Sequence, residues 1–158
     1  MTELIITSPA FEQEGWIPNR HSGLGEDNSP EIRIEGIDSG AASLVITLDD
    51  LGHPIHLGYN HWVAWNIPPM NTLPEHIPQG AVCEQPFHIE QGLAYGKHCY
   101  RGPKPPFNWN HRYVFSVYAL DITLDISAES DKKAVLTALD GHILQTGVLY
   151  GKYQRAHK

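Results

Sequence analysis

Apolar residues along the chain occur in short runs, and the pattern of these runs predicts strands. Residues 43–48 are β-branched and mostly apolar, which favours an interior strand. Residues 61–67 form a second apolar run, which ends at Pro68 and Pro69. The strongest signal is residues 112–120, where strand-forming side chains follow one another without a Gly or Pro. All three segments are therefore predicted to be β-strands.

Weaker strand signals lie toward the two ends of the chain. Residues 4–6 are consecutive apolar residues, and residues 148–153 can form a last strand. Residues 31–34 alternate polar and apolar side chains, which predicts a strand that is buried on one face only.

One segment late in the chain has the pattern of a helix. Ser130 or Asp131 can cap its beginning, and Gly141 can end it. The apolar face at helical spacing consists of Ala134, Val135, Ala138 and Leu139. Because strands dominate and one helix comes late, the predicted class is mainly β with a peripheral helix.

Prolines and glycines punctuate the rest of the chain. There are 12 prolines and 14 glycines, and this number disfavours long helices. Three long irregular segments are predicted, at about residues 15–30, 68–92 and 96–110. Segments this long in a compact domain either serve function or are disordered, and the sequence leaves both readings open.

Length and composition predict one soluble domain over residues 1–158. Hydrophobic residues make up 41% and charged residues 18% of the 158 residues, which argues against disorder. The formal net charge of −7, with no basic stripe, argues against a nucleic-acid partner. We expect a cytoplasmic protein without stable membrane insertion, because no apolar stretch approaches the roughly 20 residues of a transmembrane helix. The N-terminal segment also lacks the basic start of a secretory signal.

Metal, cofactor and nucleophile signals are weak. Cys83 and Cys99 lack the spacing of a zinc site and are expected to be reduced. His53 and His56 are three residues apart, but they lie in a predicted loop. No H-E-x-x-H and no G-x-S-x-G motif occurs in the sequence. We therefore assign no catalytic residue, no metal ligand and no cofactor from the sequence.

Polar residues gather beside three predicted strand ends. Asp50 follows residues 43–48, His61 begins the next strand, and His111 and Tyr113 begin the strongest one. Strand ends can meet at one edge of a sheet, where a carboxylate and two imidazoles would form a polar pocket. Imidazole N–H groups donate to anion oxygens, and a carboxylate can orient a histidine. Each residue also has a structural interpretation, because Asp50 can belong to a turn and either histidine can be satisfied within the core.

Taken in order, these features resemble the phosphatidylethanolamine-binding protein family, in its bacterial and archaeal branch, often called Raf-kinase-inhibitor-like. The resemblance covers nearly the whole chain. It rests on residues 11–18 (F-x-x-x-G-x-I-P), 25–30 (G-x-N-x-S-P with one residue of slack), 50–54 (D-P-D-A-P), 61–63 with 66–68 (H-W-V, N-I-P), 100–106 (Y-x-G-P-x-P-P), 111–115 (H-R-Y-x-F) and 151–155 (G-x-Y-x-R).

The resemblance implies a fold and a site. The fold is a β-sandwich of two sheets with short peripheral helices, and relatives of this branch are often homodimers. The implied anion pocket is formed by Asp50, His61, His111 and Tyr113, with a wall of Gly102, Pro105 and Pro106. The family's tight turn further implies a cis bond between His53 and Pro54.

Two positions depart from the family's pattern. Gly52 stands where the family has the second aspartate of D-P-D-A-P, which removes a carboxylate from the expected pocket. Lys104 replaces the usual small residue or cysteine inside G-P-x-P-P. If Lys104 points inward it adds a cation, but solvent exposure is the favoured expectation.

The expected function is an anion-binding module that holds a phosphate-bearing small molecule, a lipid headgroup or a phosphorylated group. One alternative is a protein-interaction inhibitor of a kinase or protease, which the family names imply. Another, less favoured because neither a nucleophile nor a metal motif is found, is a hydrolase with His61 or His111 as general base.

Overall fold

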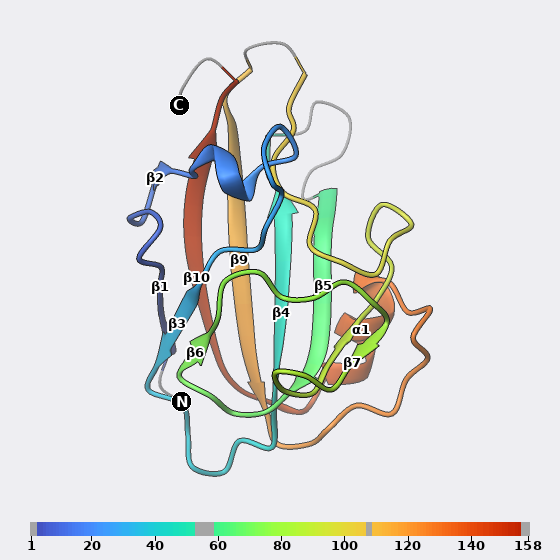
Figure 1. The fold of residues 1–158 in the computed structure, drawn as a ribbon. Coiled ribbons are helices and arrows are strands. Elements are labelled where there is room, and N and C mark those ends of the chain that lie inside the picture. Colours follow the sequence, from blue (N-terminus) through green and yellow to red (C-terminus); the bar gives the residue numbers. More distant parts are fainter. Residues whose placement is uncertain (1–2, 53–58, 107–108, 156–158) are drawn as a thin grey trace.

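Two β-sheets pack face to face in the computed structural model, which describes residues 3–52, 59–106 and 109–155 (Figure 1). The larger sheet contains, in spatial order, β2 (Gly15–Trp16), β10 (Ile143–Tyr153), β9 (His111–Leu120), β4 (Ser43–Asp50), β5 (Tyr59–Ile67), β8 (Ile89–Gln91) and β7 (Val82–Cys83). The smaller sheet contains β1 (Ile5–Thr7), β3 (Ile32–Glu35) and β6 (Thr72–Leu73). The predicted mainly-β fold of two sheets is confirmed.

Strand β4 lies in the middle of the larger sheet and is buried along its whole length. Alternation explains how both of its faces become covered. Leu44, Ile46 and Leu48 join the core between the two sheets. Val45, on the other face, joins a second core with Trp65 beneath the helix. The mostly apolar run of residues 43–48 is therefore typical of a strand covered on both sides.

The helix α1 (Lys132–Leu139) covers this second core. Of the two predicted capping residues, Asp131 caps the helix, because its side chain accepts a hydrogen bond from the Ala134 N–H at 3.0 Å. An isolated helix of this length is marginal in water. Its stability comes from packing, since Val135 and Leu139 are buried against the sheet.

Several predicted elements differ in detail from the structure. The predicted last strand is the second half of β10, which begins at Ile143 and pairs with β9 along nearly its whole length. The region 68–92, predicted to be an irregular loop, contains the short strands β6, β7 and β8. The described residues also include a 3-10 turn, η1 (Asn19–His21), which was not predicted.

Three further expectations have separate outcomes. Cys83 and Cys99 are both free, as expected. The His53–Pro54 bond lies outside the described residues, and the cis peptide bond that the structure contains joins Gln85 to Pro86. Among the residues described, no helix is both long enough and apolar enough to cross a membrane.

The antiparallel order of the central strands brings three chain segments to one end of the sheet. The C-terminal end of β4 lies beside the N-terminal ends of β5 and β9, at the upper end of Figure 1. In this register Asp50 pairs with Tyr59 on one side and Tyr113 on the other. The three polar strand ends predicted from the sequence therefore meet.

Candidate functional site

A β-bulge in β5 directs His61 toward the site. Leu48 pairs with Trp62 and the next residue of β4, Asp49, pairs with Asn60, so His61 is an extra residue in the ladder. Such a bulge changes the direction of a side chain. His61 and Trp62 therefore lie on the same face of the sheet, although they are consecutive in sequence. Strict alternation would have placed one of them beneath α1.

Asp50 is the centre of the polar cluster. Its Oδ2 atom accepts a hydrogen bond from Nδ1 of His111 at 2.8 Å and lies 3.9 Å from Nε2 of His61. The three side chains are nearly completely buried. Their expected convergence is confirmed, because a single small anion can reach all three.

The His61 ring is fixed by the backbone. Its Nδ1 atom lies 2.9 Å from the carbonyl oxygen of Arg101, and its Nε2 atom is buried and has no hydrogen-bond partner. Burial lowers the pKa of His61 from its usual value, more than the nearby Arg101 carbonyl and the Asp50 carboxylate raise it. The ring is therefore held neutral more strongly than an exposed histidine.

Tyr113 closes the floor beside His61. The two rings meet edge to face, with centroids 5.6 Å apart. The Tyr113 hydroxyl is buried without a hydrogen-bond partner, and burial raises the pKa of that hydroxyl well above its usual range. A buried hydroxyl that is still protonated and unpaired is a donor available to a ligand.

The wall of the site is the loop that contains Gly102, Pro105 and Pro106. The Gly102 N–H donates to Oδ1 of Asp27 at 2.7 Å. A Cβ atom at position 102 would lie 2.0 Å from the carbonyl oxygen of His21, so only glycine fits there. Burial raises the pKa of Asp27, against the lowering effect of the Gly102 N–H.

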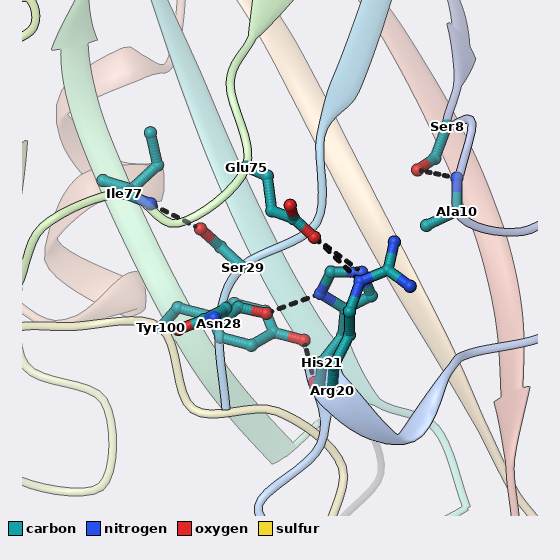
Figure 2. Close-up of polar contacts among 9 residues, drawn as sticks. All are labelled: Ser8, Ala10, Arg20, His21, Asn28, Ser29, Glu75, Ile77 and Tyr100. Carbon is teal, nitrogen blue, oxygen red and sulfur yellow. Dashed lines mark hydrogen bonds and ion pairs between the residues drawn. The ribbon is translucent and has the colours of Figure 1, made fainter. Parts of the chain in front are cut away.

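A layer of polar contacts supports this wall from behind (Figure 2). The Tyr100 hydroxyl donates to the His21 carbonyl at 2.6 Å, and the His21 ring contacts the Asn28 carbonyl at 2.7 Å. Glu75 pairs with Arg20 at 2.9 Å and lies 3.4 Å from the His21 ring. These contacts fix η1 against the wall, so the loop is held on its outer side as well as at the sheet.

Together these groups line a cavity of about 220 Å³. Its lining residues are Asp50, His61, Tyr95, Arg101, Gly102, Lys104, Pro105, Pro106, His111 and Tyr113. All seven residues assigned to the pocket from the sequence lie here, and their role in binding stays a prediction. Lys104 is exposed, as favoured, and still reaches the lining.

Sequence reasoning missed Tyr95, Arg101 and the supporting Asp27. The Arg101 guanidinium lies 5.1 Å above the Tyr95 ring, and that ring meets His61 at 4.9 Å. Tyr95 and Asp27 have positive φ angles in loops, which no periodicity marks. Arg101 stands directly before Gly102 in the quoted Y-x-G-P motif, so its position beside the wall was the one available signal.

Gly52 has a packing reason for lacking a side chain. Its N–H donates to Oδ1 of Asp50 at 2.8 Å, and a Cβ atom there would lie 3.0 to 3.2 Å from the Cα, Cγ and Cβ atoms of His111. A carboxylate at this position would require His111 to shift. The single carboxylate among the lining residues is therefore Asp50, within the described part of the chain.

The chain is similar to proteins with known sequences. A UPF0098 protein of Pyrococcus abyssi is 41% identical over 155 residues, which is 97% of this chain and 86% of the relative. A UPF0098 protein of Methanothermobacter thermautotrophicus is 40% identical over 152 residues, or 95% of this chain and 98% of the relative.

Solved structures and a family profile agree with this similarity. A phosphatidylethanolamine-binding protein homologue from Chlamydia trachomatis has a TM-score of 0.84 at 33% identity, covering 98% of this chain and 99% of that one. Escherichia coli YbcL has a TM-score of 0.83 at 25% identity, covering 96% of this chain and 98% of its own. The profile described as phosphatidylethanolamine-binding protein matches residues 7–154. The chain therefore belongs to the phosphatidylethanolamine-binding protein family.

Proposed function

We propose that the cavity binds the phosphate group of a small molecule, a lipid headgroup or a phosphorylated side chain. The observation that carries the proposal is a pair of buried polar atoms without hydrogen-bond partners, Nε2 of His61 and the Tyr113 hydroxyl, in a cavity that both residues line. Unpaired buried polar atoms are costly, and a functional site is one setting in which they persist.

Charge and size both favour a small anion. Arg101 and Lys104 bring two cations to the lining, and a cation pairs well with phosphate oxygens. The cavity of about 220 Å³ is smaller than the roughly 300–1,000 Å³ typical of sites that enclose a drug-sized ligand. A phosphate headgroup fits such a volume, while the rest of a larger ligand stays outside.

Calorimetric titration with phosphoethanolamine tests the proposal. We expect binding to strengthen from about pH 8 to about pH 6, because a phosphate monoester has a pKa of about 6 and its protonation reduces repulsion by Asp50. Replacing His111 by Ala removes a hydrogen bond to a charged group, worth roughly 1.5–3 kcal/mol, so affinity should fall about ten- to a hundredfold.

His142→Ala is the matched control, because His142 is partly exposed and pairs with Asp121 rather than lining the cavity. It should leave affinity unchanged. No heat of binding at millimolar ligand, or equal losses in both variants, would refute the proposal.

One contact favours a hydrolase as a second candidate. The buried hydrogen bond between Asp50 and His111 has the carboxylate–imidazole arrangement that orients a general base. Turnover of simple phosphate and carboxylate esters that disappears in His111→Ala would support this candidate. Absence of turnover with intact binding would leave the binding module.

A further inference from the structure

The floor of the cavity holds more hydrogen-bond acceptors than donors. Nδ1 of His61 faces the Arg101 carbonyl, and Nδ1 of His111 faces the Asp50 carboxylate. Both partners can only accept, so each Nδ1 atom carries the ring hydrogen. In a neutral imidazole the other nitrogen is then an acceptor. Both Nε2 atoms therefore present lone pairs.

Two of these acceptors face each other. Nε2 of His61 lies 3.9 Å from Oδ2 of Asp50, and Nε2 has no hydrogen-bond partner in the structure. The Tyr113 hydroxyl is a single donor beside them. Burial lowers the pKa of His61, so the ring gains a hydrogen less readily than an exposed histidine. A hydrogen must come from elsewhere to satisfy this pair.

The charged groups around the pair do not supply that hydrogen in the unbound protein. Asp49 and Asp50 favour the protonated His61 ring, but burial outweighs them. Asp27 lies behind the wall, and Arg101 and Lys104 lie in the wall itself. The two cations can hold anionic oxygens of a ligand while the floor accepts from it.

We propose that the cavity recognises phosphate through a hydrogen that the ligand itself carries, and so discriminates against sulfate. The inference rests on the proposed function and narrows its ligand class to anions with an acidic O–H group. That group would donate to Asp50 or His61, while the Tyr113 hydroxyl and the two cations bind the other oxygens.

Near pH 8, hydrogen phosphate and sulfate make a matched pair of probes. Both are tetrahedral dianions of similar size, but only hydrogen phosphate has an O–H group. Net charge therefore cannot separate their affinities. A buried acceptor left unpaired costs roughly 1–3 kcal/mol, so we expect inorganic phosphate to bind about ten- to a hundredfold more tightly than sulfate.

Asp50→Asn tests the origin of the preference. The amide can donate to an oxygen without a hydrogen, so sulfate should gain affinity relative to phosphate, and the ratio should fall toward one. Asp49→Asn is the matched control. Asp49 is buried in the same strand but pairs with Lys132, away from the cavity lining, so its replacement should keep the ratio.

A second measurement on the unaltered protein keeps the test decisive if Asp50→Asn does not fold. Methyl phosphate carries a hydrogen at about pH 5.5 but has lost it at about pH 8, since its pKa is about 6. Its affinity should fall at least about tenfold over this range, while sulfate stays weak at both values.

The outcomes separate this inference from the proposed function. Equal affinity for phosphate and sulfate near pH 8 would overturn the inference and leave the anion site standing. No binding of either probe at millimolar concentration would overturn both. A preference that survives unchanged in Asp50→Asn and in a His61→Gln variant would also overturn the inference, because the selecting acceptor would then lie elsewhere.

Discussion

Two adjacent carboxylates in β4, Asp49 and Asp50, are 2% and 3% exposed and have opposite surroundings. Asp49 faces α1, where it pairs with Nζ of Lys132 at 2.8 Å and accepts from Nδ2 of Asn60 at 3.1 Å. Asp50 faces the other side, where its partners are an imidazole, the Gly52 N–H and the cavity. Strand alternation alone separates the two environments.

The difference shows what distinguishes a site from a structural ion pair. Both carboxylates are buried, so burial does not separate them. Asp49 has a full-time cation and closed contacts, whereas neighbours of Asp50 keep unpaired atoms next to an accessible volume. We expect changes around Asp49 to alter stability and changes around Asp50 to alter binding.

The largest expected effect comes from Gly102→Ala, which disturbs the Asp50 side without touching Asp50. The new Cβ atom would lie 2.0 Å from the His21 carbonyl, so the wall must move. Overpacking costs roughly 1–3 kcal/mol of stability, and we expect phosphoethanolamine affinity to fall by about a hundredfold. Gly40→Ala is the control, because its Cβ atom would meet the end of the Asp38 side chain at 3.1 Å. Calorimetry and urea unfolding measure both effects, and unchanged affinity in Gly102→Ala would contradict the prediction.

Lys132→Ala should have the reverse signature. It leaves the buried Asp49 carboxylate without this cation, although Asn60 still donates to it. Because the Lys132 side chain is partly exposed, the expected loss in unfolding free energy is about 1–3 kcal/mol. Affinity for phosphoethanolamine should not change. Lys133→Ala, at an exposed neighbour in the same helix, controls for lost charge and helix propensity, and an equal loss there would break the comparison.

Two buried tyrosines give a smaller effect with opposite signs. The Tyr113 hydroxyl has no partner, so Tyr113→Phe should raise the free energy of unfolding by up to about 1 kcal/mol and weaken phosphate binding roughly three- to tenfold. The Tyr100 hydroxyl donates to the His21 carbonyl, so Tyr100→Phe should lower stability by about 1 kcal/mol. Urea titration of both variants tests this, and destabilisation of equal size in both would show that Tyr113 is a structural residue.

The smallest effect is the pH dependence that His61 contributes to stability. Its pKa in the folded protein is lowered by burial below the usual 6.5, so the unfolded chain takes up a proton first as pH falls. This contribution to stability is therefore complete above pH 6.5 and is lost progressively as pH falls below it. His21, whose pKa is lowered by burial as well, adds a loss of the same sign.

Unfolding measured at about pH 7 and about pH 5 should show a smaller loss for His61→Gln than for the unaltered protein. His142→Gln, at a partly exposed position, should keep the original loss. A loss that is unchanged in His61→Gln would mean that the ring is not held neutral by the fold.

The sequence predicted the strands that bury their side chains on both faces, and it predicted the meeting of three strand ends. Apolar runs such as residues 43–48 carry that information locally. The short strands β6, β7 and β8 could not be predicted, because residues such as Thr72 and Val82 pair only after the long strands exist. Their structure depends on tertiary contacts more than on propensity.

The candidate site was predicted in part for a related reason. Asp50, His61, His111 and Tyr113 lie at strand ends and in motifs that the family resemblance marks. Arg101 and Asp27 lie in loops, where side-chain direction depends on turns such as the positive φ of Asp27. The bulge at His61 was also invisible to alternation, because Trp62 beside it lies on the same face.

The bulge in β5 also bears on how such a site can arise. The neighbouring pairs, Trp62 with Leu48 and Asn60 with Asp49, are consecutive on the β4 side, so the ladder does not need His61 to stay in register. Inserting a single codon into a regular strand would add this imidazole without moving any other side chain to the opposite face. Evolution can thus gain or lose the cavity's histidine at one position while the core between the sheets keeps its pairing.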